Sequence, residues 1–112
     1  MIATWQRELE IFCSAYGSGF CLLWDDEPTG REGALGMSGA SSHAQLYGGN
    51  VIAAKPTPHS VHSIAHEIAH GIVEWQGHGF DDEKRVSIEQ IAFLDRLAIA
   101  LLTASAAERS QP

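Results

Sequence analysis

Two histidines stand four residues apart in the stretch His66-Glu67-Ile68-Ala69-His70. On an α-helix, side chains four residues apart project from the same face about one turn apart, so both imidazoles could reach one metal ion. Zinc accepts neutral imidazole nitrogens, and a catalytic site keeps one position open for water, whose pKa the metal lowers towards neutrality. Glu67 follows the first histidine about a quarter-turn further round, where a carboxylate could take a proton from that water and pass it to a leaving group. The H-E-x-x-H pattern therefore predicts a site for metal-assisted hydrolysis.

The flanking residues predict that this motif lies on a helix from Pro58 to Gln76. Thr57 is the expected N-cap, Pro58 suits the first helical position, and Gly77 is expected to end the helix. The apolar residues that recur at i, i+3 and i+4 spacing predict one buried stripe, made of Val61, Ile64, Ala65, Ile68, Ile72 and Trp75. The two histidines lie off this stripe, on a flank that could line a cleft.

In this helical setting the HEIAH motif resembles the active-site helix of the zincin metallopeptidases. The resemblance covers the motif and the helix after it, well under half of the chain. It implies one zinc ion bound by His66 and His70, Glu67 as general base and acid, and hydrolysis of a peptide bond. It also implies that an edge strand beside the helix holds the substrate peptide by main-chain pairing.

Two residues compete to be the third metal ligand. Glu89 lies on the following helix, which resembles the layout of the gluzincin-like and ImmA/IrrE-like metallopeptidases. A carboxylate at the start of an otherwise apolar helix also needs a partner such as a metal ion, which favours Glu89. His78, followed by Gly79, instead resembles the loop histidine of the SprT-like enzymes. The predicted ligands are therefore His66, His70 and Glu89, with His78 as the alternative to Glu89.

Length and charge limit the classes of function. A chain of 112 residues fits one domain, expected to span residues 1–105 and to be followed by a disordered tail at 106–112. A net charge of -7 with only seven Lys and Arg residues argues against binding nucleic acid. No apolar run reaches the ~18 residues of a membrane span, and the N-terminal residues do not resemble a signal peptide, so no membrane partner and a cytoplasmic location are expected. Cys13 and Cys21 are expected to be reduced and buried.

The remaining segments predict an α+β fold, a minimal zincin-like domain. A helix capped by Thr4 is expected to end at Gly17, and residues 20–24 are expected to form a strand that is buried on both faces or central in the sheet. Residues 34–39 could form a second strand, and residues 44–47 and 51–54 a hairpin, giving a small antiparallel or mixed sheet of three or four strands. A backing helix from about residue 81 to residue 105 is expected to pack behind the metal helix, where Gly71 would let the two backbones approach.

These inferences together predict a zinc-dependent metallopeptidase that acts on a protein or peptide substrate. The chain is so short that substrate choice is expected to depend on a partner protein or a homo-oligomer. The alternative is a non-catalytic zinc-binding interaction or regulatory protein of the same fold. Glu67 favours catalysis, because a purely structural zinc site has no use for a base and would close with four protein ligands.

Overall fold

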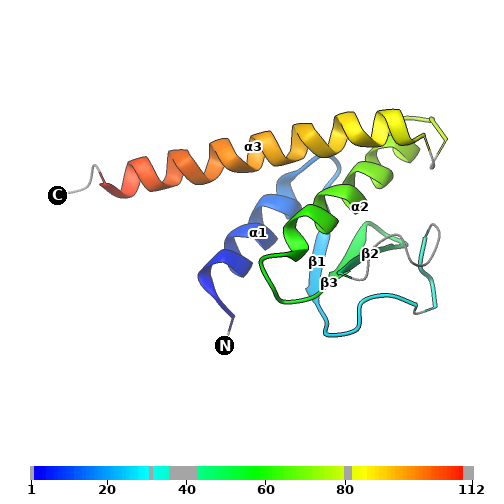
Figure 1. Cartoon of the computed structure of the whole chain (residues 1–112), viewed down its shortest axis with the longest axis horizontal. Helices are drawn as coiled ribbons and strands as arrows, with labels where there is room; N and C mark the ends of the chain where they lie inside the picture. The colour runs from blue at the N-terminus through cyan, green and yellow to red at the C-terminus, as the bar shows by residue number, and fades with distance from the viewer. Residues whose placement is uncertain (1, 31, 36–42, 80–81, 110–112) are drawn as a thin grey trace.

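The computed structural model describes residues 2–30, 32–35, 43–79 and 82–109. The elements within these ranges are α1 (Thr4–Ala15), β1 (Cys21–Trp24), β2 (Ala44–Tyr47), β3 (Val51–Ala54), α2 (Ser60–Trp75) and α3 (Glu83–Arg109). Helices α1 and α2 lie between α3 and the small sheet (Figure 1). The predicted α+β class is confirmed.

The sheet is mixed, with strand order β1-β3-β2. Strand β2 pairs with β3 antiparallel through the expected hairpin, whose turn contains Gly49 and Asn50 with φ of 76° and 60°. Strand β1 pairs with β3 in parallel. The prediction that β1 is central or buried on both faces is wrong, because β1 forms an edge and its side chains alternate. Leu22 points into the core, whereas Cys21 and Leu23 are exposed.

The free edge of β2 is partly covered by the chain itself. Ala34 forms an isolated antiparallel bridge with Tyr47, and the Leu35 amide donates to the Leu46 carbonyl over 2.8 Å. Most of the predicted strand at 34–39 lies outside the described residues. The bridge nevertheless shows that residues 34 and 35 run beside β2.

Helix α1 supplies aromatic side chains to the main core. Phe12 and Tyr16 each contact the ring of Phe93 from α3, edge to face, with centroid distances of 5.3 and 4.9 Å. Phe93 is fully buried. Cys13, also in this core, is a free thiol whose pKa burial raises to about 12. Cys21 is free as well, but it is exposed, so its predicted burial is wrong.

Both predicted helix caps lie one or more residues from their expected positions. The N-cap of α1 is Ala3, and Thr4 is the first helical residue. The N-cap of α2 is His59 rather than Thr57, whose hydroxyl instead lies 3.4 Å from the Ser60 hydroxyl. The first helical position therefore falls two residues after Pro58.

The C-terminal end of α2 is as expected in its backbone, since Gly77 has a φ of 87°. The side chain of the last helical residue does not match the prediction. Trp75, predicted to continue the buried stripe, is 78% exposed.

Helix α3 packs along α2, as predicted (Figure 1). It continues to Arg109, so residues 106–109, predicted as part of a disordered tail, are helical. Gly71 does not face α3. A Cβ atom there would lie 3.0 Å from Cε2 of Phe20 and 3.5 Å from Cδ2 of Leu46, so the missing side chain makes room for the sheet layer. Across the described ranges, no helix combines the length and the apolar character needed to cross a membrane.

Candidate metal centre

The structure brings His66, Glu67 and His70 together on one face of α2. Their ligand atoms lie within 4.8 Å of one another, and the two Nε2 atoms are 3.0 Å apart. Two nitrogens bound at about 2.0–2.1 Å to one tetrahedral ion are roughly 3.3 Å apart, so small side-chain rotations would admit an ion between them. This group could therefore hold a metal ion, as the spacing in the sequence predicted.

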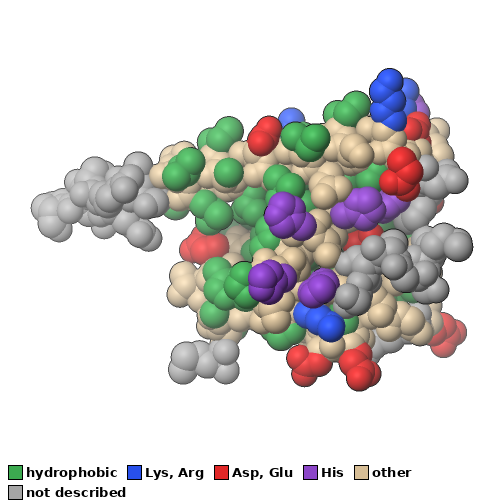
Figure 2. Space-filling view, viewed as in Figure 1, with side chains coloured by type: hydrophobic (Ala, Val, Ile, Leu, Met, Phe, Trp, Pro, Cys, Tyr) green, Lys and Arg blue, Asp and Glu red, His purple; other side chains and the backbone are tan. Residues whose placement is uncertain are grey.

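The two imidazoles are neither turned apart nor both sealed in the core. Their rings meet edge to face, with centroids 4.6 Å apart and an interplanar angle of 86°. His70 is 7% exposed, whereas His66 is only partly buried. Figure 2 shows histidine side chains on the face of the molecule turned to the viewer. The His66 side chain is therefore partly open to solvent.

Gln90, on α3, holds His66 in place. Its Oε1 lies 2.8 Å from Nδ1 of His66. A carbonyl oxygen can only accept, so Nδ1 of His66 carries the proton and Nε2 presents a lone pair. In the metal-free pair the 3.0 Å contact between the two rings then has Nε2 of His70 as donor, so an ion could bind both Nε2 atoms only after this proton moves to Nδ1 of His70. Gln90 therefore fixes the tautomer in which Nε2 of His66 can bind a metal ion.

Glu67 is buried beside the histidines, with 5% of its surface exposed. Its Oε1 accepts a hydrogen bond of 3.0 Å from the Leu46 amide on β2. Loss of water around the carboxylate raises its pKa above the ordinary value of 4.5, while the Leu46 hydrogen bond and the nearby charges of His70 and His66 act in the opposite direction. The result is a carboxyl group that holds a proton more readily than an exposed one.

The strand edge beside this carboxylate is already engaged at Leu46. The Leu46 amide donates to Glu67, and its carbonyl accepts from Leu35. Gln45 adds a side-chain hydrogen bond of 2.8 Å from Nε2 to the Leu35 carbonyl. The chain's own residue 35 therefore occupies the main-chain position at Leu46 where an extended peptide could otherwise pair with β2.

The two candidate third ligands lie elsewhere. Among the described residues, neither Glu89 nor His78 belongs to the group of metal-binding atoms. Glu89 lines a separate cavity of about 560 Å³ together with Trp75 and Arg96. His78 follows the end of α2, where its amide donates to the Val73 carbonyl over 3.1 Å.

The position of Glu89 has a simple geometric cause. Successive residues on a helix point about 100° apart, so the rotation of α3 that aims Gln90 at His66 aims Glu89 elsewhere. Gln90 is thus the site residue that sequence reasoning missed. The contact between Gln90 and His66 depends on how α3 packs against α2, which the sequence does not show. The one hint in the sequence is that Gln90 adjoins Glu89, which was predicted as a ligand.

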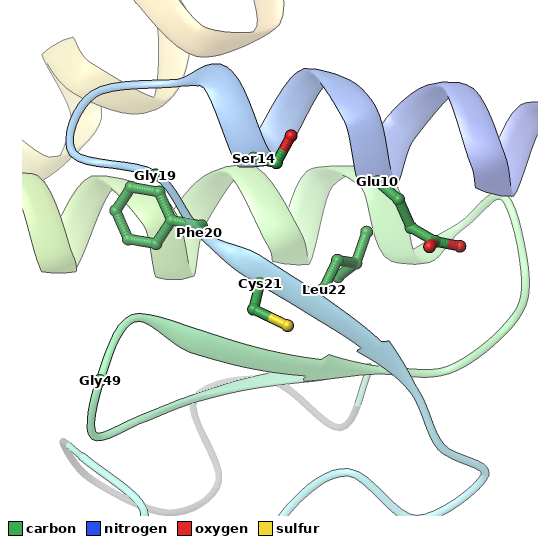
Figure 3. A pocket seen from close by; sticks show the side chains of 7 residues that line it. All are labelled: Glu10, Ser14, Gly19, Phe20, Cys21, Leu22 and Gly49. Atoms are coloured by element: carbon green, nitrogen blue, oxygen red, sulfur yellow. The ribbon is translucent and has the colours of Figure 1, made fainter.

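A second cavity, of about 410 Å³, lies between α1, β1 and the turn after β2 (Figure 3). Its lining includes Glu10, Ser14 and the exposed thiol of Cys21. Glu10 already accepts a hydrogen bond of 2.9 Å from Nε1 of Trp24. None of the lining residues belongs to the histidine group, so this cavity is separate from the candidate metal centre.

A scan against protein-family models and searches of curated proteins and of solved structures found no match to this chain.

Proposed function

We propose that the protein is a zinc-dependent metallopeptidase that hydrolyses peptide bonds in a protein or peptide substrate. The observation that carries the proposal is the pair of facing Nε2 atoms, 3.0 Å apart, beside the buried carboxyl group of Glu67. His66 and His70 would hold the ion. When bound, zinc supplies Lewis-acid chemistry that lowers the pKa of water and polarises the substrate carbonyl.

Glu67 moves the proton in the proposed reaction. The Leu46 amide holds Oε1, so the carboxylate has a set direction and its other oxygen can take a proton from the attacking water. The protonated carboxyl of Glu67 would then deliver that proton to the leaving amine nitrogen. A carboxyl group at this position serves first as base and then as acid.

The third protein ligand proposed from the sequence is Glu89, with His78 as the alternative. Zinc content of Glu89→Ala and His78→Ala, measured after purification and dialysis, distinguishes them. The variant that lacks the third ligand is expected to lose zinc, while the other keeps it. Retention of zinc by both variants would rule out both assignments.

A non-catalytic zinc-binding protein is the second candidate, and one observation favours it. Leu35 occupies the Leu46 carbonyl at the β2 edge beside Glu67, so a substrate strand would have to displace it or bind at another position. In a protein that only binds a partner, this edge could remain closed.

Zinc content followed by cleavage of a peptide library tests the proposal. Wild-type protein is expected to contain zinc and cleave peptides, and His66→Ala is expected to lose both properties. Glu67→Gln should keep zinc but show no cleavage. The matched control is Glu74→Gln, an exposed carboxylate on the same helix, which should retain both.

Two results would contradict the enzyme assignment. Cleavage by Glu67→Gln at the wild-type rate would show that Glu67 is not the base. Zinc-loaded wild-type protein that cleaves no peptide in the library would favour the non-catalytic candidate.

A further inference from the structure

The outward face of α3 carries an apolar pair between two opposite charges. Ile88 and Ile91 are 58% and 60% exposed, and Lys84 and Asp95 are exposed on the same side. The spacing of these four positions, i, i+4, i+7 and i+11, keeps them on one stripe of a helix. Figure 2 shows hydrophobic side chains along the outer edge of α3, with basic and acidic groups among them.

This stripe lies opposite the face that packs on the rest of the protein. Val86 and Phe93 are fully buried on the inward face, and Gln90 also points inward to His66. The two isoleucines, adjacent on this stripe, form an exposed apolar pair on the outward face of α3. The outward stripe and the metal centre are therefore on different faces of α3.

We propose that this stripe binds the same stripe of a second copy of the chain, with the two α3 helices antiparallel. The four positions are symmetric about the point midway between residues 89 and 90. A twofold axis through that point places Lys84 of each copy opposite Asp95 of the other, and Ile88 opposite Ile91. Such a self-complementary patch is what a symmetric dimer requires.

The charges favour this arrangement over a parallel pair and over an antiparallel pair centred on Asp95. A parallel pair would place Lys84 against Lys84 and Asp95 against Asp95. An antiparallel pair centred on Asp95 would bring the two aspartates together. Like charges across an interface are unfavourable, so both alternatives are disfavoured, whereas the proposed register pairs opposite charges at both ends of the apolar contact.

The size of the patch predicts a weak, reversible dimer. Residues 84–95 span roughly 17 Å of helix, and a standard stable interface buries about 800 Å² on each partner, more than one short helix face supplies. A dissociation constant of about 10 μM to 1 mM is therefore expected. The two Lys84–Asp95 contacts lie at the rim, so salt should weaken the association.

Sedimentation equilibrium between 10 μM and 1 mM protein tests the inference by charge reversal. Wild-type protein is expected to change from monomer to dimer over this range. Lys84→Asp and Asp95→Lys, made singly, each create two like-charge contacts and should weaken association about tenfold or more. The double variant Lys84→Asp/Asp95→Lys restores opposite charges and should return to the wild-type dissociation constant.

Two further variants separate this register from general stickiness of α3. Ile91→Glu should abolish association. Leu102→Lys should not, because in this register Leu102, although 68% exposed, lies beyond the start of the other copy's α3. All four changed positions are solvent-exposed, and circular dichroism checks that each of the five variants remains helical.

Any of three results would overturn the inference. These are a wild-type protein that stays monomeric at 1 mM, single charge reversals that leave association unchanged, or a double variant that does not recover. Because the stripe does not include the histidines, the zinc and cleavage measurements can fail without affecting this result, and the reverse also holds.

Discussion

Replacing Gln90 by leucine is expected to weaken zinc binding without removing either histidine. Leucine has a similar size but no acceptor for the proton on Nδ1 of His66, now 2.8 Å from the amide oxygen. Removing the hydrogen-bond partner of a histidine ligand typically lowers metal affinity about 10–100-fold, or about 1.4–2.8 kcal/mol. His66 could also adopt the tautomer with the proton on Nε2, and this nitrogen would then have no lone pair for the metal ion. We therefore expect the affinity for zinc to fall by about 10–100-fold.

Competition with a chelating indicator, at one pH and with metal-stripped protein, measures this change. Gln90→Glu keeps an acceptor at the same place and should bind zinc at least as tightly as wild-type protein. Ser87→Ala is the matched control, since Ser87 is an exposed residue of the same helix, and it should bind as wild type does. Thermal unfolding of the metal-free variants separates loss of affinity from loss of fold.

One pattern of results would refute the reasoning about His66. If Gln90→Leu binds zinc with the wild-type dissociation constant while His66→Ala loses zinc, the Gln90 contact does not control the ligand. If His66→Ala also retains full affinity for zinc, His66 is not a zinc ligand and the assignment of the metal centre is wrong.

Two more predictions concern stability. Burial raises the pKa of Glu67 above its ordinary 4.5, so ionisation of this carboxyl destabilises the folded state. The free energy of unfolding therefore falls as pH rises from 4.5 through the raised folded-state pKa. Metal-free Glu67→Gln, whose amide oxygen can still accept from Leu46, should therefore have a higher Tm than wild type at pH 7, and this difference should disappear towards pH 4; a difference independent of pH would contradict the burial argument. Phe93→Ala, at a fully buried ring, should reduce the free energy of unfolding in urea by about 3–5 kcal/mol. Ile99→Ala, at a side chain 63% exposed, should change it by no more than about 0.5 kcal/mol, and equal losses would show that Phe93 is not central to the core.

Local spacing was enough to predict the core of the site. His66, Glu67 and His70 lie on one helix, and helical geometry alone places residues four apart on one face. The hairpin from residue 44 to residue 54 was predictable for a similar reason, since a glycine-rich turn between two short apolar runs brings its own strands together. Each of these inferences depends on contacts between residues close in sequence.

The features that the sequence did not reveal depend on contacts between segments far apart along the chain. The pairing of β1 with β3 leaves β1 at an edge, although its five-residue apolar run is typical of a buried strand. Gly71 faces Phe20 rather than α3, because its surroundings depend on which side of α2 meets the sheet.

The sequence by itself determined that two imidazoles and a carboxyl group share one face of a helix, because the periodicity of that helix is encoded locally. Only the tertiary structure decided which side chain of α3 supports them. Gln90 rather than Glu89 meets His66 because one residue step turns a helix by about 100°, and the rotation of α3 is set by the packing of Val86 and Phe93 in the core.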